Sequence, residues 1–187
     1  MKYKFSDDHH YFAGRALSNF ENIVLPMKNR NAPLRFLEWG VAEGRCSTWM
    51  LDNVLTHTDS TLDCVDLHLW ENTMHNLKSH IDAKKCRVFN EYTYTALAKM
   101  LCEGGQYDFI YIDACHRSCN VIQDAVMSFP MLKTGCIMAF DDYEWFDPKY
   151  ASSLIETPKP AIDFFLSSFS EQLKVIYKKY QVYVLKE

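Results

Sequence analysis

Short apolar runs alternate with segments of helical spacing along most of this chain. Five of the runs have the length and apolar content of buried strands, at residues 34–40, 61–69, 86–91, 107–113 and 135–142. Between and after them, apolar residues recur every three or four positions, as on one face of a helix. These helical segments cover residues 46–57, 71–82, 94–105, 118–132 and 159–169. Strands and helices that alternate in units of about 30 residues predict right-handed βαβ units and a parallel sheet.

Both ends of the chain break this alternation. Residues 173–186 form two alternating strands joined around Lys178 and Lys179, which predicts a hairpin at the antiparallel edge of the sheet. Residues 1–33 are polar and aromatic, and we expect one helix there, from about Phe12 to Val24, ending before Pro26. The sequence thus predicts an N-terminal helical or lid segment at 1–33. It also predicts an α/β domain at 34–187 with a mostly parallel seven-stranded sheet and helices on both faces.

Composition and charge exclude several classes of protein. The chain has 187 residues, 48% of them hydrophobic and 14% aromatic, as expected of one ordered domain. Its net charge is −4 and no run of Lys or Arg exceeds two residues, so we expect no nucleic-acid partner. No stretch resembles a signal peptide or a membrane span, so we expect no membrane association. The seven cysteines are odd in number and lie mostly in apolar runs, which predicts reduced thiols and a cytoplasmic protein.

Acidic or strongly polar residues end all five predicted strands of the alternating region. They are Glu38, Asp66, Asn90 with Glu91, Asp113, and the pair Asp141–Asp142. A structural explanation exists at any single site, because Asp and Asn often form hydrogen bonds with the backbone of a turn. In open α/β sheets, however, ligands bind beyond the carboxyl ends of the strands. The repetition at five strand ends therefore indicates a binding site.

The stretch "EWGVAEGRCS" (38–47) is the most informative of these strand ends. Gly40 and Gly44 bracket a tight turn from strand to helix, where the missing side chains let the backbone approach a ligand. The N-terminus of the following helix favours an anionic group, and Asp66 is suited to accept hydrogen bonds from ribose hydroxyls. A nicotinamide oxidoreductase ranks last among the hypotheses, because the G-x-G-x-x-G fingerprint is absent.

Four stretches together resemble a known family. "FLEWGVAEGRCS", "CVDLH", "YDFIYIDACH" and "GCIMAFDDYEW", in this order and spacing, are similar to class I S-adenosylmethionine-dependent methyltransferases. The resemblance is closest to small bacterial-type O-methyltransferases and the catechol O-methyltransferase group, and it covers roughly residues 34 to 186. It implies a Rossmann-like methyltransferase fold and methyl transfer to a hydroxyl of a small molecule.

The resemblance also implies which residues hold the cofactor S-adenosylmethionine. These residues would form the loop beneath the cofactor, contact its methionine carboxylate, accept hydrogen bonds from its ribose and surround its adenine. They are Glu38, Gly40, Val41, Gly44, Ser47, Asp66, Glu91 and Asp113. Two positions depart from the family pattern and bear on cofactor affinity. Glu43 stands where many members have Gly or another small residue, and Cys46 stands where many have Ser.

Asp113, Asp141 and Asp142 form the predicted metal site. Carboxylates that converge without a cation raise one another's pKa values, whereas Mg²⁺ or a similar divalent cation prefers such oxygen ligands. The resembling enzymes hold a metal at the equivalent positions. Alternatively, Asp142 caps a turn and only Asp141 points inward.

The resemblance implies that His116, three residues after Asp113, is the catalytic base beside the acceptor hydroxyl. An imidazole titrates near neutral pH and suits this role, and Asp113 would share in catalysis. The alternatives are a surface histidine or a zinc site with Cys115 and Cys119, although the latter lacks a second pair of ligands.

Aromatic residues are candidates for the walls of the acceptor site. Tyr143, Trp145 and Phe146 would either line a dry pocket or serve ordinary packing. The N-terminal residues 9–11, "HHY", would form either a lid over the acceptor or a solvated tail.

Three functions remain open from the sequence. The first is a metal-dependent O-methyltransferase acting on a small hydroxylated acceptor, with a homo-oligomer left open. The second is a metal-independent methyltransferase whose carboxylates position the substrate directly. The third is a non-catalytic methyltransferase-like module for cofactor binding or interaction.

Overall fold

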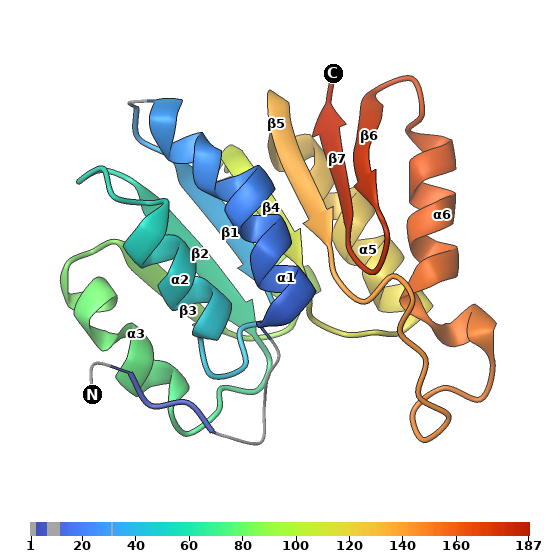
Figure 1. Cartoon of the computed structure of the whole chain (residues 1–187), viewed down its shortest axis with the longest axis horizontal. Helices are drawn as coiled ribbons and strands as arrows, with labels where there is room; N and C mark the ends of the chain where they lie inside the picture. Colours follow the sequence, from blue (N-terminus) through green and yellow to red (C-terminus); the bar gives the residue numbers. More distant parts are fainter. Residues whose placement is uncertain (1–2, 7–11, 31) are drawn as a thin grey trace. The chain divides into compact units, whose positions relative to one another are not determined.

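Seven strands form where the sequence predicts them. In the computed structural model, which describes residues 3–6, 12–30 and 32–187, they follow the order β3-β2-β1-β4-β5-β7-β6. Their bounds are β1 Arg35–Trp39, β2 Thr61–Asp66, β3 Cys86–Asn90, β4 Tyr107–Ile112, β5 Leu132–Phe140, β6 Leu173–Lys178 and β7 Val182–Lys186. The predicted mixed sheet, mostly parallel with a C-terminal antiparallel hairpin, is confirmed (Figure 1). Residues 9–11, the predicted lid, lie outside the described residues.

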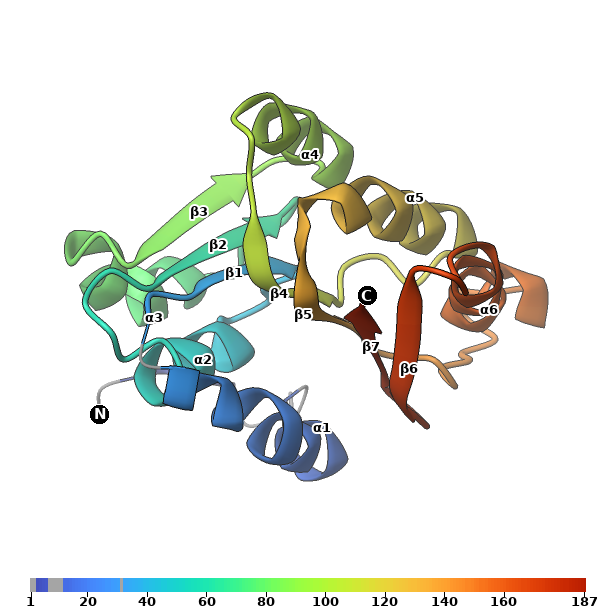
Figure 2. The same ribbon diagram turned by 90° about the horizontal axis from the view of Figure 1, so that it is seen from above.

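The chain divides into two compact units, Met1–Glu91 and Tyr92–Glu187. In the first, β1 pairs with β2 and β2 with β3, all parallel. Their buried residues, such as Phe36, Leu37 and Val65, are fully shielded from solvent. Helix α2 (Arg45–Asn53) and helix α3 (Thr73–Asp82) are the crossovers that these parallel pairs require (Figure 2). The sequence-based division at residues 33 and 34 stays a prediction.

The N-terminal helical run differs from its prediction. It consists of α1 (Gly14–Asn19), one π-helical turn η1 (Phe20–Val24) and a 3-10 turn η2 (Leu25–Arg30). The α- and π-helical part ends at Val24, before Pro26 as expected, but the run continues as η2, which has this proline in its first turn. A proline is tolerated there, since the first N–H groups of a helix have no partner within it.

Helix α2 is shorter than its sequence pattern, which runs to residue 57. Its last helical residue is Asn53, and the N–H groups of Val54 and Leu55 both donate to the Met50 carbonyl at 2.9 Å. Both side chains are nevertheless buried. The periodicity therefore identified the apolar face correctly, but not the end of the helix.

The second unit contains the antiparallel edge. β4 pairs with β5 in parallel, and β7 pairs antiparallel with both β5 and β6. Helix α5 (Ser118–Ser128) packs against β4 and against α6 (Pro158–Ser168), while α4 (Thr93–Cys102) contacts α5. A short 3-10 turn η3 (Phe129–Met131) contains Pro130, and a second one, η4 (Leu154–Glu156), precedes α6.

Strand β5 fixes where the paired carboxylates stand. It begins at Leu132, three residues earlier than predicted, and its register with β4 shifts between Tyr107 and Phe109. Gly135 has φ of 74°, as such a β-bulge can require. The strand ends at Phe140, so Asp141 and Asp142 follow it directly.

The cysteines and helices bear on two further predictions. The seven cysteines, all among the described residues, form no disulfide; Cys46, Cys64, Cys86 and Cys136 are buried and the other three are exposed. Within the described part of the chain, no helix has the length and apolar character needed to cross a membrane.

Candidate active site

The Gly40–Gly44 loop joins β1 to α2 and is held by Asp66 at the end of β2. One carboxylate oxygen of Asp66 accepts hydrogen bonds from the N–H groups of Val41 (2.7 Å) and Ala42 (3.1 Å). The other oxygen accepts one from His68 N–H at 2.9 Å. The predicted ribose acceptor therefore already organises the glycine loop.

The loop backbone is strained at one position. Three of its residues have positive φ: Gly40 (87°), Ala42 (47°) and Gly44 (78°). Glycine adopts this region at no steric cost, but for Ala42 it costs about 1 kcal/mol or more. Such a conformation persists only when its surroundings hold it. Here the Thr73 hydroxyl donates to the Ala42 carbonyl, and Asn76 Nδ2 donates to the Glu43 carbonyl at 2.8 Å.

Glu38 and Ser47 form a buried pair under this loop. Glu38 is 1% exposed, and the Ser47 hydroxyl donates to its carboxylate. Burial raises the pKa of Glu38 to about 7, although the hydrogen bond from Ser47 acts in the opposite direction. The Ser47 hydroxyl thus faces Glu38, which leaves its backbone N–H as the group in the first turn of α2 suited to an anion.

The remaining predicted cofactor residues of the first unit lie near the strand ends. Glu91 follows β3 directly, and its neighbour Asn90 donates from Nδ2 to the carbonyls of Asp66 (3.1 Å) and Leu67 (2.9 Å). Asn90 thereby fastens the end of β2 to the end of β3. Cys46, the second departure from the family pattern, is buried in α2 at 8% exposure.

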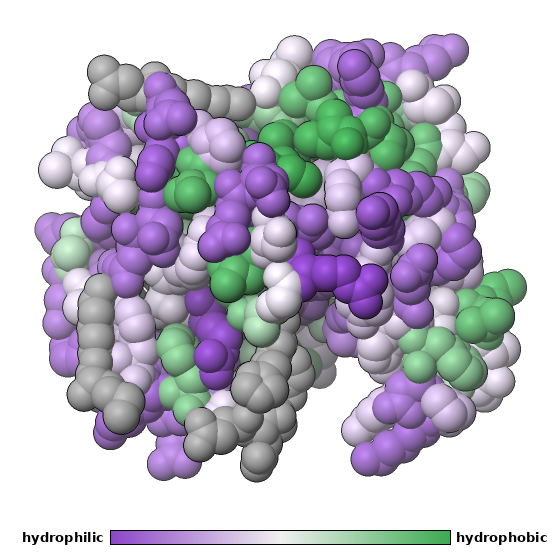
Figure 3. All heavy atoms as spheres, viewed as in Figure 1, coloured by the Kyte–Doolittle hydropathy of each residue, from purple (hydrophilic) through white to green (hydrophobic). Residues whose placement is uncertain are grey.

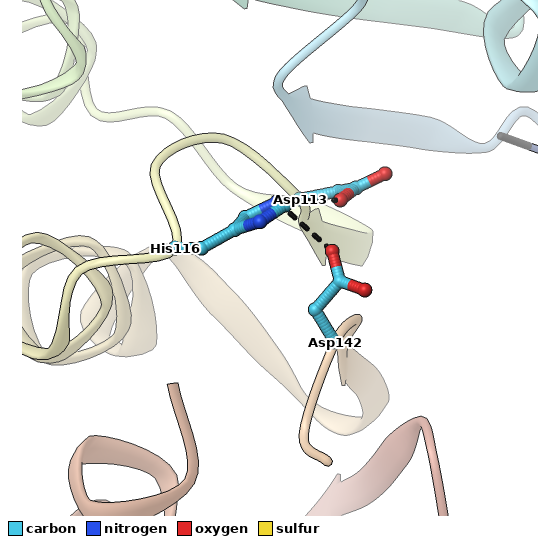
Figure 4. Close-up of side chains that lie close together, drawn as sticks. All are labelled: Asp113, His116 and Asp142. Atoms are coloured by element: carbon cyan, nitrogen blue, oxygen red, sulfur yellow. Dashed lines mark ion pairs between the residues drawn. The ribbon is translucent and has the colours of Figure 1, made fainter. Parts of the chain in front are cut away.

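In the second unit, three side chains converge at the ends of β4 and β5. Atoms of Asp113, His116 and Asp142 that can bind a metal lie within 4.8 Å of one another (Figure 4). His116 Nε2 is 2.9 Å from Asp142 Oδ2 and 3.9 Å from Asp113 Oδ1. Neither Cys115 nor Cys119 belongs to this group, and both are exposed.

Asp141 does not belong to that group and has hydrogen-bond partners of its own. One of its oxygens accepts hydrogen bonds from the Tyr111 hydroxyl and from Gln181 Nε2 (3.1 Å), and the other accepts from Asp142 N–H (2.8 Å). Burial and the charge of Asp142 raise the pKa of Asp141 to about 6, against these hydrogen bonds. The structure therefore brings together Asp113 and Asp142 with His116, and not all three predicted carboxylates. Asp141 instead accepts hydrogen bonds from Tyr111 and Gln181.

Asp142 is held in place from the β6–β7 turn. Its φ is 57°, in the left-handed region that Asp tolerates. The Tyr180 hydroxyl donates to its Oδ1 at 2.7 Å, which leaves Oδ2 for His116. Burial alone would lower the pKa of His116, but the ion pair with Asp142 outweighs it and the pKa is raised. In this form His116 is paired, and the carboxylate of Asp142 stabilises the imidazolium relative to the neutral ring.

A cavity of about 380 Å³ lies beside His116 within the second unit. Its lining includes Arg117, Trp145, Asp147, Tyr150 and Glu156. The His116 and Trp145 rings meet edge to face at 4.8 Å, and Trp145 is followed by Tyr150 at 6.5 Å. A row of rings therefore leads outward from the Asp113–His116–Asp142 group.

Tyr150 and two residues that follow it, in η4, are exposed apolar side chains. Tyr150, Leu154 and Ile155 are 61%, 68% and 73% exposed, and Figure 3 shows apolar side chains gathered over this segment. The two acids of the cavity wall already accept local hydrogen bonds, Asp147 from Lys149 N–H and Glu156 from Ser152. The cavity therefore offers a ligand the rings of Trp145 and Tyr150, together with the side chain of Arg117.

The three predicted wall residues have different positions. Trp145 lines the cavity, whereas Tyr143 is buried and its hydroxyl donates to Asp163 at 2.8 Å. Phe146 is 46% exposed and does not belong to the lining. Of the two predicted roles, Trp145 has that of a pocket wall and Tyr143 that of ordinary packing, whereas Phe146 lines no part of this cavity.

Sequence reasoning missed Tyr111, Tyr180 and Gln181 as parts of the site, and it missed Tyr150 as a wall. The first three bind carboxylates 30 to 40 residues away in sequence. No local pattern carries that information. A weak signal did exist, since "YQVY" places polar and aromatic residues at the turn of the terminal hairpin.

Comparison with protein families gives one match, described as a methyltransferase domain, over residues 37–143. This range covers more than half of the chain and contains the glycine loop, Asp66 and all of the Asp113–His116–Asp142 group. No curated protein matches the chain in sequence.

Several solved structures share the fold. The methyltransferase MycE from the mycinamycin biosynthetic pathway, in complex with Mg and SAH, is 14% identical with a TM-score of 0.68. That match covers 97% of this chain but 52% of MycE, so the chain spans about half of that protein's length. A putative O-methyltransferase from Klebsiella pneumoniae and the O-methyltransferase TomG from Streptomyces achromogenes, in complex with SAM, are each 14% identical with a TM-score of 0.72. Each of these two matches covers 96% of this chain and 83% of the other. At this identity the likeness concerns the fold.

Proposed function

Because the chain belongs to the methyltransferase-domain family, we propose that it is a divalent-cation-dependent O-methyltransferase that methylates a hydroxyl of a small molecule. S-adenosylmethionine would be the methyl donor. The observation that carries this proposal is the group of Asp113, His116 and Asp142, with His116 also lining a cavity large enough for a small acceptor. Family membership alone supports methyl transfer, and this group points to a hydroxyl acceptor.

The cofactor would be bound by residues of the first unit. Asp66 and the loop it holds offer a carboxylate and closely spaced backbone groups, the chemistry that suits a ribose and a methionine zwitterion. Gly40, Val41 and Gly44 let the backbone approach the ligand, and Ser47 N–H suits its carboxylate. Glu38 supports the loop from below, and Glu91 stays the predicted neighbour of the adenine.

The donor set fits a hard divalent cation. Asp113 and Asp142 are carboxylates, which Mg²⁺ prefers, and both lie at strand ends where their backbone is fixed. Asp141 stays a predicted third ligand that would first have to release Tyr111 and Gln181. When bound, the cation would stabilise negative charge on the acceptor oxygen and orient the acceptor.

The chain's own residues would supply the base and the dry pocket. His116 Nε2 would accept the hydroxyl proton once it is released from its ion pair with Asp142. Tyr180 keeps Asp142 oriented by its hydrogen bond at 2.7 Å. Trp145 and Tyr150 would stack against a flat acceptor and exclude water, which favours transfer between a sulfonium and an oxyanion.

The second candidate is the non-catalytic cofactor-binding module. The two departures from the family pattern, Glu43 and Cys46, are the observation that favours it. Glu43, however, is engaged with the N-terminal segment rather than pointing into open space, so a steric conflict with the cofactor is not required.

Calorimetry with S-adenosylhomocysteine and a Mg²⁺ titration, followed by methyl-transfer assays on a panel of phenols and sugars, tests the proposal. We expect cofactor binding, turnover that EDTA abolishes and Mg²⁺ restores, and loss of Mg²⁺ affinity in Asp142→Asn. His116→Asn should lose turnover but retain Mg²⁺ affinity, because the proposed role of His116 is that of a base and not of a metal ligand. Turnover that is unaffected by EDTA would contradict the proposal and support the metal-independent methyltransferase. Cofactor binding without any turnover would support the non-catalytic module.

A further inference from the structure

The N-terminal residues 3–6 are fastened to α2, α3 and the glycine loop. The Tyr3 hydroxyl donates to Asp52 of α2 at 2.8 Å and lies 3.0 Å from His80 Nε2 of α3. The Arg45 guanidinium lies 4.3 Å from the centre of the Phe5 ring. Figure 1 shows this segment alongside α3. It is therefore docked by side chains of two helices, although it belongs to no helix or strand itself.

Asn76 and Glu43 connect the segment to the loop. Asn76 is 1% exposed: its Oδ1 accepts from Lys4 N–H at 2.7 Å, and its Nδ2 donates to the carbonyls of both Lys4 and Glu43 at 2.8 Å. The Glu43 carboxylate, in a residue 4% exposed, accepts from Ser6 N–H at 2.9 Å and from the Ser6 hydroxyl. Asn72 Nδ2 also donates to it, at 3.2 Å. One buried amide and one buried carboxylate thus join residues 4 and 6 to residue 43.

This connection reaches the strained part of the loop. Ala42, with φ of 47°, lies directly before Glu43, and its N–H is one of those bound by Asp66. A residue other than glycine keeps this conformation only when its neighbours fix the chain on both sides. Asp66 and Thr73 hold Ala42 itself, and the contacts of Glu43 hold the next residue. Without Ser6, the Glu43 carboxylate would be buried with one hydrogen-bond partner fewer on each oxygen, and it would move toward solvent.

We propose that residues 3–6 are a strap that keeps the Gly40–Gly44 loop in its cofactor-binding form, with Glu43 and Asn76 as the positioning residues. The inference rests on the proposed function, since the loop is the proposed cofactor loop. In this arrangement Glu43 anchors the strap through its contacts with Ser6. The N-terminal segment thereby becomes a determinant of cofactor affinity.

Three variants and one control test the strap. Ser6→Pro removes both the N–H and the hydroxyl that bind Glu43, and Glu43→Ala removes their acceptor. Asn76→Ala removes the bonds to Lys4 and the bond to the Glu43 carbonyl. Lys4→Ala is the matched control, because its side chain is exposed and its backbone bonds remain. We expect the Kd for S-adenosylhomocysteine to rise about 10-fold in each of the three variants and to stay unchanged in the control. The double variant Ser6→Pro/Glu43→Ala should bind S-adenosylhomocysteine no more weakly than the weaker-binding single variant, since both substitutions break the same contact.

Binding is measured well below the melting temperature, with circular dichroism to verify that each variant is folded. Hydrogen exchange at the Val41 and Ala42 amides should accelerate in Ser6→Pro and not in Lys4→Ala. If the variants lose thermal stability but bind S-adenosylhomocysteine with the wild-type Kd, the segment is merely structural and the strap is refuted. If the wild-type protein itself does not bind S-adenosylhomocysteine, the proposed function fails and the strap fails with it.

Discussion

Replacing Asp124 by Asn should stabilise the protein more at high pH than at low pH. Asp124 lies on α5, is 1% exposed, and its Oδ1 has no hydrogen-bond partner among the described residues. Burial raises the pKa of Asp124 from its ordinary value of 3.8 to about 6, although a hydrogen bond from Thr93 acts in the opposite direction. An ionised carboxylate at this position is therefore costly to the folded state.

The sign and size of the effect follow from proton binding. The folded chain holds the Asp124 proton more tightly than the unfolded chain, so the group's favourable contribution is complete below about pH 4 and is lost as pH rises through about 6. The interval between 3.8 and about 6, at about 1.36 kcal/mol per pH unit, gives about 3 kcal/mol between the two limits. Asn cannot ionise, so its folding free energy lacks this contribution. The free energy of unfolding of the variant, relative to wild type, should rise by that amount between low and high pH.

Urea unfolding of both proteins at several values from about pH 4 to about pH 8 measures this difference. The test compares how the difference in unfolding free energy between the two proteins changes with pH. Any pH-independent cost of the introduced amide to stability therefore cancels. Asp59→Asn is a suitable control, because the Asp59 side chain is 77% exposed. A difference between wild type and Asp124→Asn that stays constant over this range would refute the reasoning and would mean that water or a conformational change solvates the carboxylate.

Three further predictions concern the site and the core. Tyr180→Phe removes the hydroxyl that orients Asp142, and steady-state kinetics should show kcat about 10-fold lower with unchanged S-adenosylhomocysteine affinity; an unchanged kcat would contradict the positioning role. Tyr150→Ser should raise the acceptor KM several-fold, about 3- to 10-fold, at constant kcat, and an unaltered KM would place the acceptor elsewhere. Asp63 is 1% exposed and paired with two arginine side chains at 2.7–3.0 Å, so Asp63→Asn should cost about 3–5 kcal/mol in chemical denaturation; a loss below about 1 kcal/mol would show that the pair is dispensable.

Strands were predictable because burial leaves a local pattern. The run "YDFIYI" is buried at all six positions of β4, and its hydrophobicity alone marks it as an interior strand. Helix ends were less predictable. Leu55 is fully buried yet lies beyond α2, because packing selects an apolar side chain whether or not its backbone is helical.

The acidic strand ends were also visible in the sequence. Parallel strands bring their carboxyl ends to one edge, so Asp113 and the pair Asp141–Asp142 could be assigned to one neighbourhood from connectivity alone. Their rotamers could not. Whether a carboxylate faces His116 or a buried tyrosine depends on which donors arrive from β4 and from the terminal hairpin.

By itself, then, the sequence determined the order of elements, the family resemblance and the rim on which the acids stand, since all of these follow from local periodicity and strand direction. Tertiary structure decided which side chains meet. Gln181 reaches Tyr111 across 70 residues of sequence, Tyr180 reaches Asp142 across 38, and Ser6 reaches Glu43 across 37. Each of these bonds satisfies a group that folding has removed from water, and such a partner is chosen by the packed geometry rather than by neighbours along the chain.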